Sequence, residues 1–150
     1  GTVKENIAFA SNIIEDEKVI TAAKKSEILE EINSFSNGFE TIIGERGVQL
    51  SGGQRQRLAI ARTFYKEPNL FIFDDCLSAI DATKEQIILK NLKEESKGKT
   101  SIIISHRIAT LKDTDHIIVL DAGKIIEEGT HNDLIKNKGF YFEIYQSQSN

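Results

Sequence analysis

The first 66 residues carry apolar positions at helical spacing. The segment DEKVITAAKKSEILEEINSF, residues 16–35, contains strong helix formers and neither glycine nor proline, and its apolar residues recur near a helical period. Asn37-Gly38 and the glycines at 44 and 47 indicate loops. The pattern therefore predicts a helical amino-terminal segment that gives way to loops after residue 36.

A second long helix is predicted from Ser51 or Gly52 to about Tyr65. Its predicted apolar face consists of Leu58, Ala61, Phe64 and Tyr65. The helix is otherwise basic, because it contains arginines at 55, 57 and 62 and no acidic residue. Pro68 ends the helical pattern.

From residue 69 onward the pattern changes to apolar runs separated by helical segments. LFIFDD (70–75) and TSIIISH (100–106) are typical of strands, and a helical segment lies between them at about 81–97. Continuous apolar strands that alternate with helices predict a parallel sheet that is buried on both faces.

The last third of the chain predicts a hairpin followed by a helix. Residues 116–129 form two apolar runs around an Ala-Gly pair at 122–123. A helical stretch then runs from residue 130 to about 148, and Thr130 and Asp133 have the spacing of a capping box.

Composition narrows the class of protein. The chain has 150 residues, of which 39% are hydrophobic and 28% charged, as in ordinary soluble globular proteins. The net charge of −4 argues against a general nucleic-acid binder, and no apolar run exceeds four residues, so no membrane span is predicted. The chain contains no methionine, and we therefore expect it to be a piece of a larger protein.

Two acidic residues follow the first predicted strand. Asp74 and Asp75 stand at its carboxyl end, where the ligand crevice of an open α/β sheet lies. In that position Asp74 is a candidate for holding a hydrated Mg²⁺, and Asp75 for facing an attacking water. The alternative is a solvated acidic pair at a strand end, and two residues alone do not decide between the two interpretations.

A histidine ends the next predicted strand. His106 is therefore expected near the same crevice, as a hydrogen-bond donor to a phosphate oxygen on which charge builds. Without other support it would be interpreted as a partly exposed strand-end histidine. His116 and His131 are assigned no function, because the first precedes a strand and the second lies in the first turn of a helix.

The sequence LSGGQ, residues 50–54, precedes the long helix. Ser51 and Gln54 fit a capping box, which accounts for the start of a helix. A cap does not need two successive glycines, which allow close backbone approach to a ligand. The free N–H groups of a helix start suit an anion, so an anion site is predicted here. A phosphate loop of the form G-x-x-x-x-G-K-S/T does not occur in the sequence.

Together these segments resemble the nucleotide-binding domain of ATP-binding-cassette (ABC) transporters. LSGGQ matches the signature motif of that family, LFIFDD its Walker B strand, and His106 its switch histidine. LSAID (77–81) resembles the D-loop, which ends in Asp81. GTVKENI (1–7), GERG (44–47) and the ending GKIIEEGTHNDLI are similar to the exporter branch. The resemblance covers essentially the whole chain, with the motifs in the family's order.

The resemblance implies an α/β fold. It would comprise part of a RecA-like P-loop NTPase core, with a parallel sheet and flanking helices, and the α-helical subdomain of the ABC family. Residues 1–66 would form the helical subdomain and residues 67–150 the carboxy-terminal half of the core. The Walker A loop, the adenine-stacking aromatic residue and the Q-loop glutamine are expected upstream of Gly1. The isolated chain is accordingly expected to be soluble and inactive, although the full-length protein would be an ABC-type ATPase.

The resemblance also implies how ATP and Mg²⁺ are bound. Two such domains pair head to tail, and each signature contacts the γ-phosphate of the ATP held by the other domain. The residues that would bind the partner's ATP are Ser51, Gly52, Gly53 and Gln54. ATP on this protein's own upstream loop would be served by Asp75 and His106 as catalytic residues. Asp74 would hold the Mg²⁺ ion of that site through water.

The implied partners are a second nucleotide-binding domain and the transmembrane domain of an exporter. The full-length protein would lie at the cytoplasmic face of the cell membrane, and no nucleic acid is expected to bind. The transported substrate is not encoded here, because substrate contacts lie in the transmembrane domain of such proteins.

One position departs from the family pattern. The family usually has glutamate after the Walker B aspartate, whereas this chain has Asp75. The shorter side chain withdraws the carboxylate by ~1.5 Å, one C–C bond, and a displacement of about 1 Å can cost on the order of 10²-fold in rate. We therefore expect this site to bind ATP and hydrolyse it slowly, as the degenerate half of a heterodimeric exporter.

Two alternatives remain open at this point. Asp75 also fits a cassette that traps ATP and regulates its partner without turnover. A soluble ABC ATPase of DNA repair or chromosome organisation shares the signature helix, but the GERG segment and the net charge of −4 disfavour it.

Overall fold

The computed structural model describes residues 1–45 and 47–148, which fall into two compact units, residues 1–102 and 103–150. Arg46, within the GERG segment, lies outside the described residues. The predicted boundary at residue 66 coincides with a change from helices to strands, not with the boundary between the units. The division into two subdomains at residue 66 stays a prediction.

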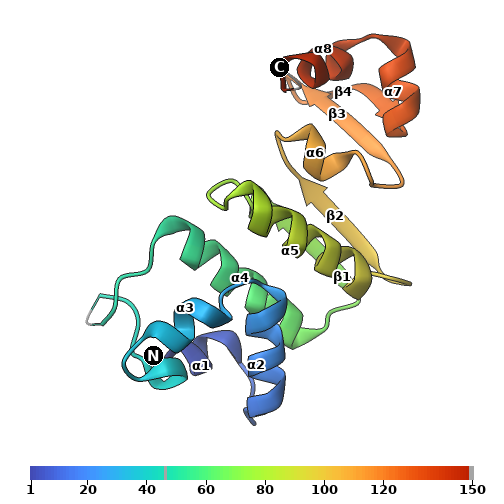
Figure 1. Ribbon diagram of the computed structural model, residues 1–150. Coiled ribbons are helices and arrows are strands. Elements are labelled where there is room, and N and C mark those ends of the chain that lie inside the picture. The colour runs from blue at the N-terminus through green and yellow to red at the C-terminus, as the bar shows by residue number, and fades with distance from the viewer. Residues whose placement is uncertain (46, 149–150) are drawn as a thin grey trace. The chain divides into compact units, whose positions relative to one another are not determined.

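The first unit begins with a helical region (Figure 1). Its elements are α1 (Val3–Ile7), α2 (Asp16–Lys25), α3 (Leu29–Ser34), the 3₁₀ turn η1 (Gly38–Glu40) and α4 (Gly52–Lys66). The helical segment predicted at 16–35 is thus two helices. The chain turns between them at Glu27, whose φ of 56° is left-handed.

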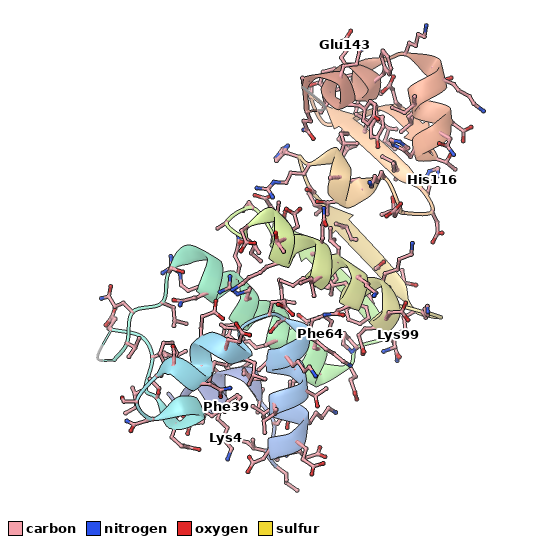
Figure 2. All side chains as sticks on the ribbon, in the orientation of Figure 1. Lys4, Phe39, Phe64, Lys99, His116 and Glu143 are labelled. Carbon is pink, nitrogen blue, oxygen red and sulfur yellow. The ribbon has the colours of Figure 1, made fainter. Side chains whose placement is uncertain are left out.

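The core of this region forms around α4, against which α1 and α2 pack. The apolar face predicted for α4 is confirmed, because Leu58, Ala61, Phe64 and Tyr65 are all buried. Figure 2 labels Phe64, which is 4% exposed. Burial of one large apolar side chain contributes about 1.5–3 kcal/mol, more than helix propensity does, so packing fixes this region.

Two strands and a crossover helix complete the first unit. β1 (Leu70–Asp74) and β2 (Thr100–Ile104) form a two-stranded sheet, and α5 (Ala82–Glu95) connects them. Phe71 and Phe73 of β1 are buried, whereas Leu70 and Ile72 are 49% and 62% exposed. Burial of the sheet on both faces is therefore not observed in the described residues, because a single crossover helix covers only one face.

The second unit contains the predicted hairpin. Its elements are α6 (Ile108–Leu111), β3 (Ile117–Asp121), β4 (Lys124–Gly129), α7 (His131–Asn137) and α8 (Phe140–Gln148). β3 and β4 pair antiparallel, and Ala122 and Gly123 both have positive φ, as a tight two-residue hairpin turn requires. The core of this unit is formed by Ile108, Ile117, Leu134 and Tyr141.

The helix predicted at the end of the chain is divided in two. The capping box of Thr130 and Asp133 is confirmed at the start of α7, which ends at Lys138 in a left-handed conformation. The carboxylate of Glu127 on β4 then accepts hydrogen bonds from the N–H groups of Phe140 (3.1 Å) and Tyr141 (2.8 Å). A side chain of β4 thus pairs two free backbone N–H groups at the start of α8. The local sequence does not reveal this contact. Within residues 1–45 and 47–148, no helix has the length and apolar character needed to cross a bilayer.

An ion cluster joins three helices of the first unit. Oε1 of Glu31 on α3 accepts hydrogen bonds from Arg57 on α4 and, at 2.8 Å, from Lys84 on α5. Arg57 is only 6% exposed. Burial raises the pKa of Glu31, but the Lys84 hydrogen bond and the charges of Arg57 and Lys84 outweigh it, so the pKa lies below its ordinary value. Glu31 therefore neutralises a buried arginine.

Replacing Glu31 should destabilise the first unit. In Glu31→Ala the buried guanidinium of Arg57 loses its carboxylate, and we expect a loss of about 2–3 kcal/mol in unfolding free energy, less than for a completely buried pair. Urea unfolding followed by circular dichroism measures this loss. Glu30→Ala, at an exposed position of the same helix, is the matched control. Equal unfolding free energies for the two variants would contradict the role of Glu31.

Candidate functional site

The start of α4 has the cap that the sequence predicts. Oγ of Ser51 accepts a hydrogen bond from the N–H of Gln54 (3.2 Å), and Oε1 of Gln54 accepts one from the N–H of Ser51 (2.9 Å). The capping box is thereby confirmed. The remaining N–H groups of the first turn have no partner within the helix, and the helix dipole favours negative charge at this end.

The two glycines at this helix start have different surroundings. A Cβ added at Gly53 would lie 2.7 Å from the carbonyl oxygen of Ala79, so only glycine fits there. A Cβ added at Gly52 would lie 3.6 Å from Cβ of Ala79, which is an ordinary van der Waals contact. The fold itself therefore explains Gly53, whereas packing within the chain does not require glycine at position 52.

Three candidate residues lie at the end of β1 and in the loop that meets these glycines. β1 ends at Asp74, and the chain turns through residues 75–81 into α5. Asp75 has a left-handed backbone, with φ at 45°. Asp81 is the N-cap of α5: its Oδ1 accepts a hydrogen bond from the N–H of Lys84 (3.0 Å), and this bond lowers the pKa of Asp81. Asp74 and Asp75 are both exposed.

Gln56, which the motifs do not single out, joins the helix to this loop. Oε1 of Gln56 accepts a hydrogen bond from the N–H of Ala79 (2.9 Å). Nε2 of Gln56 donates to Oγ of Ser78 (3.0 Å) and lies 3.4 Å from the carbonyl oxygen of Asp75. Gln56 stands three residues after Gly53 and four after Gly52, so the three share one helix face. This spacing was the signal by which Gln56 could have been found.

The structure brings LSGGQ (50–54) and the loop of residues 75–81 together within the first unit. His106 lies in the second unit, where its side chain is exposed and its carbonyl accepts a hydrogen bond from Nε2 of Gln148 (2.7 Å). The roles predicted for Asp74, Asp75 and His106 at one nucleotide stay predictions.

The carboxylate at the end of β1 could bind Mg²⁺ if phosphate oxygens and water supplied the other ligands. In residues 1–45 and 47–148, no three His, Cys, Asp or Glu side chains form a group that could hold a metal ion. Mg²⁺ commonly takes one or two protein carboxylates and completes its shell with water and substrate phosphates. The single exposed carboxylate of Asp74 fits that second arrangement.

A family model and individual relatives both match this chain to ABC transporter proteins. The family model described as ABC transporter matches residues 1–78. The chain is 45% identical over 148 residues to an uncharacterized ABC transporter ATP-binding protein, YwjA, of Bacillus subtilis, and covers 26% of that protein. It is 44% identical over 147 residues to a probable multidrug resistance ABC transporter ATP-binding/permease protein, YheI, of the same organism, and covers 25% of it. These matches take in 99% and 98% of the chain.

A solved structure shows the same fold. The structure of a bacterial Atm1-family ABC exporter with ATP bound matches with a TM-score of 0.93 and 40% identity, over 99% of this chain and 26% of that one. The chain therefore spans about a quarter of the length of the relatives that it matches.

The two glycines should respond differently to the same substitution. Gly53→Ala forces a methyl group against the carbonyl of Ala79, and we expect it to lower the unfolding free energy by about 1–3 kcal/mol. Gly52→Ala has room for the methyl group and should change the unfolding free energy by less than about 0.5 kcal/mol. Urea unfolding of both variants measures the difference. Equal losses would show that the contact with Ala79 is not the constraint on Gly53.

Proposed function

The chain belongs to the ABC transporter family, and on that premise we propose that it is the signature-bearing part of an ATP-binding cassette that powers an exporter. The observation that carries this proposal is the start of α4, where a capped helix end presents N–H groups beside a glycine that its own fold does not require. An incoming phosphate accounts for the missing side chain of Gly52, because a Cβ would keep the anion from the backbone.

The ATP at this helix start belongs to a second cassette. In a head-to-tail pair of cassettes, the signature of one cassette completes the nucleotide site of the other. Ser51 supplies a hydroxyl, and Gly52 and Gly53 supply N–H groups, to the γ-phosphate that the partner holds. The N-terminal end of the helix dipole favours that negative charge.

The ATP bound to this protein's own upstream loop is served by a different set of residues. Asp74, at the end of β1, holds Mg²⁺ through water, and the ion supplies charge neutralisation on the phosphates. Asp75 orients the attacking water, and His106 donates a hydrogen bond to the γ-phosphate oxygen. Because the Asp75 carboxylate is one methylene shorter than glutamate, this site binds ATP and turns it over slowly.

The helical region carries the contact with the transmembrane domain at the cytoplasmic face of the membrane. Phe9 and Ile13, in the connection between α1 and α2, are 65% and 79% exposed. The guanidinium of Arg62 lies over the ring of Phe9, with Cζ 5.9 Å from its centroid. Large exposed apolar side chains that are close in sequence favour a protein contact at this connection.

A cassette that traps ATP without turnover is the second candidate function. The observation in its favour is Asp75, whose side chain is one methylene shorter than that of a glutamate.

The signature proposal predicts a loss of activity without a loss of stability. In the full-length transporter with its partner, Gly52→Ala should slow hydrolysis of the partner-bound ATP by about 10²-fold, because the methyl group displaces the phosphate by about 1 Å. Single-turnover hydrolysis with the other site disabled measures the effect. Ala59→Ser, at an exposed position of the same helix, is the control and should be silent. Unchanged hydrolysis in Gly52→Ala would rule out a phosphate at this position.

The slow-site proposal predicts a gain of activity. Asp75→Glu restores the longer side chain and should raise hydrolysis at this protein's own site by about 10²-fold. The measurement is single-turnover hydrolysis with the partner's site inactivated, and Asp75→Asn serves as the carboxylate-free control. Brisk hydrolysis by the unmodified protein would contradict the slow site. Absence of turnover in both the unmodified protein and Asp75→Glu would favour the ATP-trapping cassette.

A further inference from the structure

We propose that Gln56 is a positioning residue that couples the start of α4 to the backbone of Asp75. The inference rests on the proposed function, in which the start of α4 meets the partner's ATP and Asp75 serves this protein's own ATP. Gln56 lies between the two, two residues after LSGGQ and beside the loop that carries Asp75.

Both polar atoms of the Gln56 side-chain amide form hydrogen bonds. Its carbonyl oxygen accepts the N–H of Ala79 at 2.9 Å, and its amide nitrogen donates to the hydroxyl of Ser78 at 3.0 Å. The hydroxyl of Ser78 in turn donates to the carbonyl oxygen of Asp75 at 3.1 Å. The direct approach of the amide nitrogen to that oxygen is longer, at 3.4 Å. The shorter connection therefore runs from Gln56 through Ser78 to Asp75.

The restrained carbonyl belongs to a residue whose backbone needs support. Asp75 has a φ of 45°, a backbone conformation that is unfavourable for most L-residues and persists only where surrounding contacts hold it. An aspartate side chain has only two rotatable bonds, so for a given backbone its carboxylate is limited to a few positions. A group that fixes this peptide therefore narrows the positions open to the candidate catalytic carboxylate.

The loop is also held against the helix by shape. Ala79 gives its N–H to Gln56, and its carbonyl oxygen would lie 2.7 Å from a Cβ on Gly53. Both backbone polar groups of Ala79, its N–H and its carbonyl, thus meet the first two turns of α4. A shift of the helix start on binding the partner's phosphate must therefore move residues 75–79 as well, because packed surfaces transmit displacement.

Kinetic measurements on the full-length transporter with its partner test this coupling. Gln56→Met keeps the length of the side chain and removes its hydrogen bonds, and Ser78→Ala removes the hydroxyl that relays them. We expect Gln56→Met to lower the single-turnover rate at this protein's own site by about 10-fold while the KM for ATP changes by less than about 2-fold, the pattern of a group that acts in the transition state. Gln86→Ala, at an exposed position of α5, should match the unmodified protein.

A double-mutant cycle separates coupling from simple loop anchoring. If Gln56 acts through Ser78, the Gln56→Met/Ser78→Ala double variant should be no slower than the slower single variant. Additive losses would overturn the proposal, as would a rate in Gln56→Met equal to that of Gln86→Ala.

Amide hydrogen exchange gives a measure of the contact that does not depend on hydrolysis. In Gln56→Met the N–H of Ala79 should exchange about 10-fold faster or more, because its acceptor is gone. Faster exchange without a slower rate would overturn the proposal, since Gln56 would then anchor the loop and nothing more. If the unmodified complex hydrolyses no ATP, the proposed function fails, whereas the exchange result still decides whether Gln56 restrains the loop.

Discussion

The close contact between the first turn of α4 and the loop of residues 75–81 is the constraint on which the candidate site depends. Glycine at position 53 allows the carbonyl of Ala79 to approach the helix, and Gln56 closes the contact with a hydrogen bond to the N–H of the same residue. Because β1 leads into this loop and α5 leaves it, the contact helps to set where α4 lies relative to the strand that ends at Asp74.

A buried charge reinforces the same junction. Arg57 is adjacent to Gln56 on α4 and lies 6% exposed against Glu31, which also binds Lys84 at the start of α5. Oε2 of Glu31 and Nε of Arg57 are buried without a hydrogen-bond partner. An ion pair that is incompletely satisfied contributes little net stability, yet losing one member is costly. The cluster therefore acts mainly by fixing how α3, α4 and α5 fit together.

Features determined by neighbouring residues could be predicted from the sequence. The bounds of α4, both capping boxes and the hairpin turn at 122–123 follow from residues within a few positions of each other. The breaks at Glu27 and Lys138 were not predicted, because both residues are helix formers by propensity and yet adopt left-handed conformations. Gln56 was missed because its hydrogen-bond partners lie 19 to 23 residues away. Motif order located the candidate residues, but contacts between distant segments decide what holds them.

The left-handed backbone at position 75 changes the meaning of an aspartate there. Aspartate is several-fold enriched among non-glycine residues with positive φ, because its short polar side chain tolerates that region. Glutamate has no such preference, so it is less favourable than aspartate at a position with positive φ. Aspartate at a φ of 45° relieves backbone strain and withdraws the carboxylate at the same time. The proposed slow site and a favourable backbone at position 75 would thus both follow from one missing methylene.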